Sequence, residues 1–278
     1  MLKKVAAIND LSGLGKCSLT VAIPILSALK VQCCPFPTAI LSNQTDFNEY
    51  TFLDLTSEMN NYSKAWQNLN LNIDTIYSGF LGSLEQINIV QNFIKENPKA
   101  YVIVDPVLGD NGNMYPTFNK EICMEMKNLI KNSNLITPNI TEACLLLDKE
   151  FNDDFSEDEV IEMAKNLSKL GPDKVIITGV VRDNMIYNLS YDKETDSTFT
   201  YGLEYNKRSY SGTGDIFVSI ICGLITNNYD LEFAVKIASD FIYKCVSYTS
   251  QFDIHRNHGV MFELFLNDLT SLNKKCNF

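Results

Sequence analysis

Residues 210–224 read YSGTGDIFVSIICGL and combine a glycine-containing turn, one carboxylate and a long apolar run. The backbone amides of Gly212, Thr213 and Gly214 can converge on an anion, because glycine lets the backbone approach a ligand closely. If residues 216–225 form a helix, nearly every face of it is apolar, as expected of a buried helix. Asp215 would lie in its first turn, beside unpaired N–H groups that favour negative charge. This pattern predicts a phosphate site with a base that accepts the proton of an attacking hydroxyl group.

The same four residues also have an ordinary structural explanation, because an aspartate after a glycine turn commonly caps a core helix. The rest of the chain favours the chemical interpretation. Five strand-like runs end in residues suited to a binding site, namely Asp10, Phe80, Asp105, Thr137 and Thr178. The carboxyl ends of parallel strands share one edge of a right-handed β-α-β sheet, and open α/β sheets bind ligands there. Five such endings therefore predict a cleft.

Two segments near these strand ends have the character of binding loops. Residues 43–50, which include Thr45, form a long polar connection that suits a lid, although a solvated loop is the commoner explanation. Residues 107–115, which follow Asp105, are rich in Gly and Asn and could move over a ligand. Lys207 precedes the glycine turn and lies near the expected nucleotide, although loop cations are usually solvated.

Several candidates have equally common structural explanations. Asp10, with Ser12 close behind it, could be a turn aspartate that binds its own backbone. Phe80 could stack on a flat ring or lie in the core. Asn139 and Glu142 are three residues apart at a predicted helix start, and Glu142 could do no more than stabilise that end.

The elements that must position these residues alternate between strand and helix, which is typical of an α/β fold. We expect strands at 5–8, 31–35 continuing at 38–42, 73–77, 101–105, 134–137 and 175–179, and helices at 16–29, 57–69, 83–96, 142–147 and 230–250. Runs of period two at 184–191 and 197–203 predict an antiparallel hairpin at one edge. The prediction is a single domain over residues 1–278. It is a Rossmann-like three-layer sandwich with a mostly parallel central sheet and helices on both faces.

Residues after the first predicted strand partly match two nucleotide-binding motifs, but neither motif is complete. Residues 13–18, GLGKCS, suggest a P-loop, but Asp10 takes the first glycine position and Cys17 stands where Mg²⁺ needs a hydroxyl. A dinucleotide motif fails because Ser18 replaces its last glycine, and no acid ends the second strand to hold a ribose. A dehydrogenase is therefore less favoured than a kinase.

The composition limits the class of partner. The chain has 278 residues, of which 45% are hydrophobic and 21% charged, so it can bury a large core. Its formal net charge of −11 argues against nucleic acid and anionic membranes as partners. An acidic protein that handles a polyphosphate needs a cation, and Mg²⁺ is the natural expectation.

The cellular location follows from what the sequence lacks. The apolar run after Lys4 is too short for a signal peptide, and no apolar stretch reaches membrane-spanning length. The eight cysteines contain no C-x-x-C motif, which indicates reduced thiols rather than a disulfide framework or a zinc site. His255 and His258 are expected at the surface. We therefore expect a cytoplasmic protein.

Taken together and in order, these motifs resemble those of the ribokinase-like superfamily. Within it the chain is similar to the pyridoxal/pyridoxamine kinases, with hydroxymethylpyrimidine kinases as close relatives. The resemblance covers nearly the whole chain and is carried by INDLSG at 8–13, LSNQT at 41–45, YSGFLG at 77–82, VDPVLGD at 104–110, TPNITE at 137–142, ITG at 177–179 and GTGD at 212–215.

The resemblance implies ATP-dependent phosphorylation of the 5′-hydroxymethyl group of a B6 vitamer by a homodimer that uses Mg²⁺, with a monovalent cation as a further candidate activator. Asp215 would be the base, and the amides of residues 212–214 would hold the phosphoryl group. Asp105 and Glu142 would organise Mg²⁺, partly through water. The vitamer ring would contact Asp10, Ser12, Thr45 and Phe80. The nucleotide would contact Asp110, Tyr115, Thr137, Asn139, Thr178, Gly179 and Lys207.

The chain departs from the family pattern at two positions and leaves two alternatives open. Asp10 stands where many pyridoxal kinases have Ser, and Gln44 where many have His. A carboxylate could prefer a protonated ring nitrogen or amine, which favours pyridoxamine or an aminopyrimidine. One alternative is a hydroxymethylpyrimidine kinase, which would differ at Asp10, Gln44 and Phe80. The other is a non-catalytic B6-binding protein. The presence of all three carboxylates expected in a kinase, Asp215, Asp105 and Glu142, argues against it.

Overall fold

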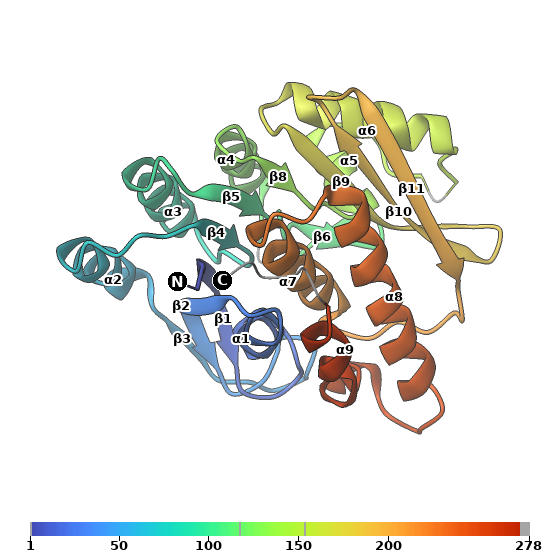
Figure 1. Ribbon diagram of the computed structural model, residues 1–278, viewed down its shortest axis with the longest axis horizontal. Coiled ribbons are helices and arrows are strands. Elements are labelled where there is room, and N and C mark those ends of the chain that lie inside the picture. The colour runs from blue at the N-terminus through green and yellow to red at the C-terminus, as the bar shows by residue number, and fades with distance from the viewer. Residues whose placement is uncertain (1, 117, 153, 273–278) are drawn as a thin grey trace.

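The computed structural model describes residues 2–116, 118–152 and 154–272 and has three layers, with one sheet between two sets of helices (Figure 1). In the described residues the main sheet consists of β1 (Lys4–Ser12), β2 (Gln32–Leu41), β3 (Phe52–Asp54), β4 (Thr75–Ser78), β5 (Tyr101–Val104), β8 (Leu135–Ile136), β9 (Lys174–Arg182), β10 (Met185–Asp192) and β11 (Ser197–Glu204). Their spatial order is β11-β10-β9-β8-β5-β4-β1-β2-β3. A small hairpin, β6 (Gly109–Asp110) and β7 (Asn113–Met114), lies apart from it.

The centre of the sheet is parallel from β2 to β9, and the strands at both edges are antiparallel. The strands β9, β8, β5, β4 and β1 are neighbours in that order. These are the five strands to which the candidate residues were assigned, and their carboxyl ends share one edge. Phe80, Asp105 and Thr137 follow the ends of β4, β5 and β8, whereas Asp10 and Thr178 lie inside β1 and β9, because these two strands are longer than predicted. The hairpin of β10 and β11 closes one side as predicted, whereas β3 at the other side was not predicted. The structure confirms the mostly parallel α/β fold.

Helices cover both faces of the sheet (Figure 1). One face carries α1 (Ser18–Ala28), α7 (Thr213–Thr226) and α8 (Leu231–Thr249), followed by η1 (Arg256–His258), η2 (Phe262–Phe265) and α9 (Leu266–Thr270). The other face carries α2 (Thr56–Asn68), α3 (Leu84–Glu96), α4 (Lys120–Ile130), α5 (Ile140–Leu146) and α6 (Glu157–Lys169). Helix α7 packs between α1 and α8, so the apolar run that follows Asp215 is buried nearly all round, as predicted.

Some local features differ from the prediction. Helices α4 and α6 lie in stretches where no element was predicted, although α6 buries Val160, Met163, Ala164 and Leu167 at helical spacing. Ser83 caps α3, because its side chain accepts a hydrogen bond from the Gln86 backbone amide at 3.2 Å. The Gln86 side chain donates to the backbone oxygen of the β2 residue Thr38 at 3.0 Å, which ties α3 to the sheet.

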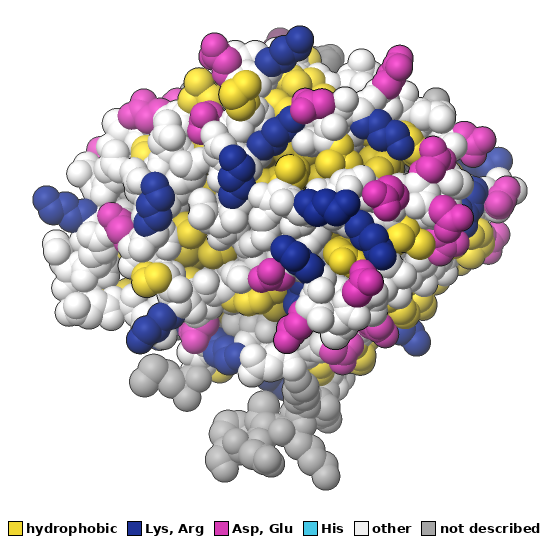
Figure 2. All heavy atoms as spheres, turned by 90° about the horizontal axis from the view of Figure 1, so that it is seen from above, with side chains coloured by type: hydrophobic (Ala, Val, Ile, Leu, Met, Phe, Trp, Pro, Cys, Tyr) yellow, Lys and Arg dark blue, Asp and Glu magenta, His cyan; other side chains and the backbone are white. Residues whose placement is uncertain are grey.

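The surface is mixed in charge on the face that Figure 2 shows, where basic side chains lie among acidic and apolar ones. In the described part of the chain, no helix combines the length and the apolar character needed to cross a bilayer. His255 and His258 are exposed, as expected.

Candidate active site

Helix α7 begins at the predicted phosphate site. Gly212 is its N-cap residue and has a φ of 80°, a left-handed conformation that glycine adopts without steric cost. A Cβ atom at this position would lie 2.0 Å from the backbone oxygen of Lys16. Asp215 occupies the first turn and is partly exposed. The first N–H groups of a helix have no partner within it, so amide donors and the carboxylate lie together at this end.

The Asp215 carboxylate is held by groups from the first β-α unit. The backbone N–H of Ser18 donates a hydrogen bond to it, and the side chain of Asn9 donates another at 3.4 Å. Burial is the main cause that raises the pKa of Asp215 to about 6, and the nearby Asp10 raises it further, while both hydrogen bonds lower it. A carboxylate with this pKa is ionised at pH 7 and is a stronger proton acceptor than an ordinary aspartate.

Asp10 lies next to Asp215 and is 6% exposed. Its two oxygens accept hydrogen bonds from the hydroxyls of Ser18 at 2.5 Å and Ser12 at 2.7 Å. Burial raises the pKa of Asp10, although both hydroxyls oppose the shift. Ser18 therefore contacts both carboxylates, and it does so from a left-handed backbone conformation with a φ of 54°. The sequence gives no signal for this role of Ser18, because residue spacing does not reveal a non-glycine residue with positive φ.

Two further carboxylates extend this group. Asp105, buried after β5, accepts a hydrogen bond from Thr137 at 3.0 Å. Burial raises its pKa to about 7, and Asp215 contributes to the shift. Burial, followed by Asp105, raises the pKa of Glu142 well above its ordinary value. We call these four residues the carboxylate row, in the order Asp10, Asp215, Asp105 and Glu142. Each carboxylate of the row disfavours ionisation of the one that follows it in this order.

The carboxylate row suits a hard cation. No ion pair among the described residues includes any of its four members. No group of three or more His, Cys, Asp or Glu side chains in this part of the chain is arranged to hold a metal alone. Mg²⁺ is usually bound by one or two carboxylates together with waters and substrate phosphates. Asp105 and Glu142 could hold it in this way, and the cation would relieve their mutual repulsion.

The raised pKa of Asp105 predicts that the stability of the metal-free protein depends on pH. Asp105 has a folded pKa of about 7 against an ordinary value of 3.8. Folding therefore favours its protonated form, and its ionisation destabilises the metal-free protein as the pH rises toward 7. Asp105→Asn has nearly the same shape and no charge, so we expect a higher Tm than the wild type at pH 8 in EDTA.

Thermal unfolding from pH 5 to pH 8.5 measures this effect. The difference in Tm between Asp105→Asn and the wild type should grow as the pH rises and level off above pH 7. Asp253→Asn removes an exposed charge and serves as the control, with an expected difference near zero at every pH. A difference that shrinks with rising pH would contradict the prediction.

Three candidate site residues, Asn139, Glu142 and Thr178, lie together at the start of α5. Asn139 caps the helix, because its side-chain oxygen accepts from the Glu142 amide at 2.9 Å and the Glu142 carboxylate accepts from the Asn139 amide at 2.9 Å. The Asn139 side chain also donates to the Gly109 oxygen at 2.9 Å. Asn139 and Thr178 form an isolated parallel bridge. The structural role that the sequence allowed for Glu142 is therefore present, alongside its place in the carboxylate row.

Other nucleotide candidates border open space. Gly179 is exposed with a φ of 70°, and a Cβ atom there would meet nothing within 4 Å. Asp110 is exposed in the β6–β7 hairpin, and its carboxylate accepts from the Asn111 amide at 2.8 Å. Tyr115 is 38% exposed, and its pKa is raised by burial and then by Glu142 and Asp110. The structure thus brings Asp110 and Tyr115 close to the far end of the carboxylate row.

Phe80 is half-buried at the end of β4. Its ring stacks on Phe118 with a centroid distance of 5.9 Å and an interplanar angle of 19°. Its backbone N–H donates to the Asn9 side chain at 2.9 Å. One face of the ring is therefore covered by protein, and any substrate would have to stack on the other.

Thr45 and Lys207 are exposed, and neither side chain forms a hydrogen bond or ion pair with another described residue. Segment 43–50 is nevertheless anchored to the predicted phosphate site. Asp46 accepts a hydrogen bond from Ser211 at 2.8 Å, and the buried Gln44 side chain donates to the Asn257 oxygen at 3.3 Å. These anchors join residues more than 160 positions apart, 165 and 213, so no local pattern could have revealed them.

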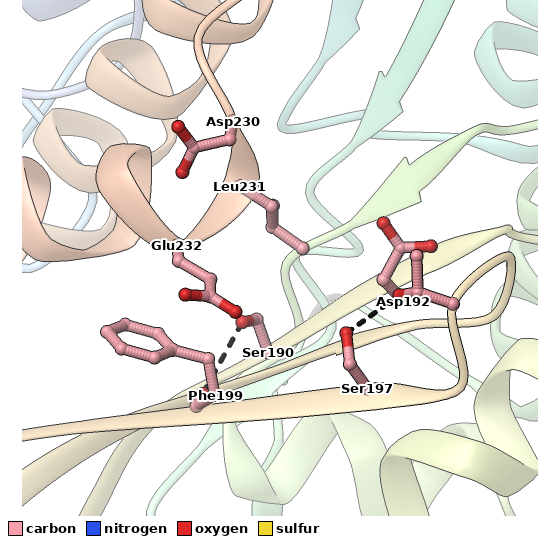
Figure 3. Close-up of a pocket in the computed structure, with 8 residues that line it drawn as sticks. Ser190, Asp192, Ser197, Phe199, Asp230, Leu231 and Glu232 are labelled. Atoms are coloured by element: carbon pink, nitrogen blue, oxygen red, sulfur yellow. Dashed lines mark hydrogen bonds between the residues drawn. The ribbon is translucent and has the colours of Figure 1, made fainter.

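A separate hollow of about 300 Å³ lies beside the β10–β11 hairpin and the start of α8 (Figure 3). Asp192 and Asp230 are among its lining residues. Asp192 pairs in register with Lys174, the first residue of β9, so the hollow lies at the amino end of the parallel strands. Asp192 forms an ion pair with Lys174, and Asp230 caps α8. This hollow is therefore distant from the candidate active site, and its Asp192 and Asp230 carboxylates both have partners within the protein.

Three comparisons identify similar proteins. The family model described as phosphomethylpyrimidine kinase matches residues 23–261. A pyridoxal kinase from Dictyostelium discoideum is 25% identical over 82% of this chain and 80% of its own length. A hydroxymethylpyrimidine/phosphomethylpyrimidine kinase from Haemophilus influenzae is 30% identical over 65% of this chain and 67% of its own length.

Solved structures are similar over nearly the whole chain. A protein from Bacteroides thetaiotaomicron, assigned as a phosphomethylpyrimidine kinase, was crystallised in an orthorhombic form with pyridoxal. It is 40% identical with a TM-score of 0.94, over 99% of this chain and 98% of its own. Pyridoxal kinase from Lactobacillus plantarum is 26% identical with a TM-score of 0.90, over 97% of both chains. These matches confirm the resemblance stated from the motifs. The chain belongs to the phosphomethylpyrimidine kinase family.

Proposed function

We propose that this protein is an ATP-dependent kinase that phosphorylates the 5′-hydroxymethyl group of a B6 vitamer, with pyridoxamine and pyridoxal ahead of pyridoxine. The observation that carries the proposal is the Asp215 carboxylate in the first turn of α7, the helix that the left-handed Gly212 caps, beside the buried carboxylate of Asp10. From the family resemblance we also propose that the whole chain is one kinase domain, which acts as a cytoplasmic homodimer.

The geometry supports a direct phosphoryl transfer. The substrate hydroxyl oxygen would attack the terminal phosphorus of ATP as the bond from that phosphorus to the bridging oxygen of ADP breaks. Asp215 would accept the hydroxyl proton, and the amides of residues 212–214 would donate hydrogen bonds to the phosphoryl oxygens. Bound Mg²⁺ would neutralise phosphate charge, with Asp105 and Glu142 as its protein ligands.

The choice of vitamer depends on the charge beside Asp215. Asp10 is buried and its nearest donors are hydroxyls rather than a cation. A protonated amine or ring nitrogen would compensate this carboxylate, which favours pyridoxamine. Pyridoxal in the structure of the 40% identical Bacteroides protein supports a B6 vitamer. The second candidate is a hydroxymethylpyrimidine kinase, favoured by the family model and by the Haemophilus relative.

A substrate panel tests the proposal. ADP release is measured with ATP, Mg²⁺ and one alcohol at a time: pyridoxamine, pyridoxal, pyridoxine or hydroxymethylpyrimidine. We expect kcat/KM to be at least about tenfold higher for the best vitamer than for the pyrimidine, since one lost charge-assisted hydrogen bond is worth about 1.5–3 kcal/mol. Asp10→Asn should reduce the preference for pyridoxamine over pyridoxal. A pyrimidine that reacts best would favour the second candidate, and no alcohol-dependent ADP release would indicate a non-catalytic binding protein.

A further inference from the structure

The side chain of Asn9 connects three elements at the candidate site. Asn9 belongs to β1 and is fully buried, with 0% exposure. Its side-chain oxygen accepts from the backbone N–H of Asp10 at 3.1 Å and from that of Phe80, after β4, at 2.9 Å. Its side-chain nitrogen donates to Asp215 Oδ1, in α7, at 3.4 Å. One amide group thus links the ends of two central strands to the proposed base.

The orientation of this amide is determined by its surroundings. A flip would place N–H groups against the N–H donors of Asp10 and Phe80 and would leave buried donors unpaired, at about 1–3 kcal/mol each. The nitrogen must therefore point toward Asp215. Gly79 makes room for it, because a Cβ atom at that position would lie 2.4 Å from the Asn9 nitrogen. The Gly79 backbone is itself held by a hydrogen bond to the Ile8 oxygen at 2.9 Å.

The titratable groups that interact with Asp215 come from four places in the fold. They are Asp10 of β1, Cys17 before α1, Tyr77 of β4 and Asp105 after β5. The two carboxylates disfavour a negative charge on Asp215. Burial raises the pKa of Cys17 and of Tyr77, so both remain neutral. The hydrogen bonds that Ser18 and Asn9 donate favour the ionised form of Asp215.

We propose that Asn9 is a positioning residue whose amide aims the Asp215 carboxylate and stabilises its ionised form. The inference rests on the proposed role of Asp215 as the base. Asn9 is fully buried, so its effect on the proposed base would pass through its hydrogen bond to Asp215. A structural role alone would lower stability but would not change the pH at which turnover is lost.

Asn9→Asp is the sharpest test. Aspartate keeps an oxygen for the two backbone N–H groups, removes the N–H donor and places a further carboxylate against Asp215. Two carboxylates in one site raise the proton affinity of the pair. In the wild type, kcat/KM should fall on acidification through the Asp215 pKa of about 6. In the variant this acid limb should move up by at least about one pH unit, with kcat at pH 7 about tenfold lower and the KM for ATP unchanged.

Two further variants separate positioning from stability and from net charge. Gly79→Ala should displace the Asn9 amide and lower kcat in the same way, whereas Asn9→Ala/Gly79→Ala should be no worse than Asn9→Ala, because the clash is then absent. Asn132→Asp adds the same charge at an exposed position and should keep the wild-type profile. A shift of equal size in Asn132→Asp would overturn the inference.

A readout without turnover keeps the test distinct from the proposed function. Carboxyl-carbon NMR, assigned with Asp215→Asn, follows the titration of Asp215 in the wild type and in Asn9→Asp. An upward shift in the variant supports the inference even if no alcohol in the panel is phosphorylated. An unchanged titration and an unchanged pH profile, with Asp215→Asn inactive, would overturn the role of Asn9 while leaving the proposed kinase intact.

Discussion

Asp215→Asn is expected to lower kcat for the preferred alcohol by at least about 10²-fold while ATP still binds, because a positioned general base contributes about 10²–10⁴ to the rate. Asparagine keeps the shape of the side chain and cannot accept the proton. It also removes a charge that disfavours the ionisation of Asp105. The variant should therefore be at least as stable as the wild type, so its inactivity would reflect chemistry rather than unfolding.

The aspartate that begins the next helix is a matched control. Asp230 is an ordinary N-cap of α8 and accepts from the Phe233 amide at 2.8 Å, whereas α7 has Gly212 as its N-cap and no side-chain cap. Asp230→Ala should cost about 1 kcal/mol of stability and leave kcat unchanged. Steady-state ADP release, calorimetric ATP titration and thermal unfolding measure the contrast. If Asp215→Asn loses stability but turns over normally, Asp215 is a capping residue and the proposed role is wrong.

Gly212→Ala is expected to have the second large effect, on both stability and turnover. The φ of 80° would cost an alanine about 1–2 kcal/mol, and its Cβ would meet the Lys16 oxygen at 2.0 Å, a contact that the backbone can relieve only by moving. Movement of the Gly212 peptide would misplace the amides that face the phosphoryl group. We expect a free energy of unfolding lower by at least about 2 kcal/mol and a kcat lower by at least about tenfold.

Gly214→Ala is the control for stability. Gly214 lies in the first turn of α7 with a negative φ, and a Cβ atom there would meet nothing within 4 Å. Denaturant unfolding should show no loss of stability in this variant, because alanine is a better helix former than glycine. Equal stability of the two alanine variants would mean that the turn at 212 tolerates a side chain, which would contradict the close approach described here.

Much of the fold was predictable because its signals are local. A helix apolar all round must be buried, and a glycine turn before it must lie where the backbone is tight. Both features appear in α7 and Gly212. Short apolar runs that end in polar residues indicated parallel strands that share one edge, and the order of the sheet confirms it. Helix α6 was missed, although its apolar positions recur at helical spacing.

The contacts that shape the site were not predictable, because they join distant parts of the chain. Asn9 and Asp215 are 206 positions apart, and no spacing relates them. Ser18 contacts two carboxylates from a backbone conformation that serine rarely adopts, so its residue type gave no signal. Sequence alone could nominate Asp10 and Asp215 separately, but only their shared contact with Ser18 places them side by side.

The sequence by itself determined which groups are present at the strand ends, namely carboxylates, hydroxyls and glycine amides, and hence a chemistry of proton acceptance and phosphate binding. Only the tertiary structure decided their electrostatic state. The order of β1, β4, β5 and β8 places Asp10, Asp105 and the start of α5 along one edge, and α7 adds Asp215. A pKa depends on burial and on neighbouring charges, and both are set by which distant segments pack together. The same four carboxylates, exposed and apart, would be ordinary surface charges.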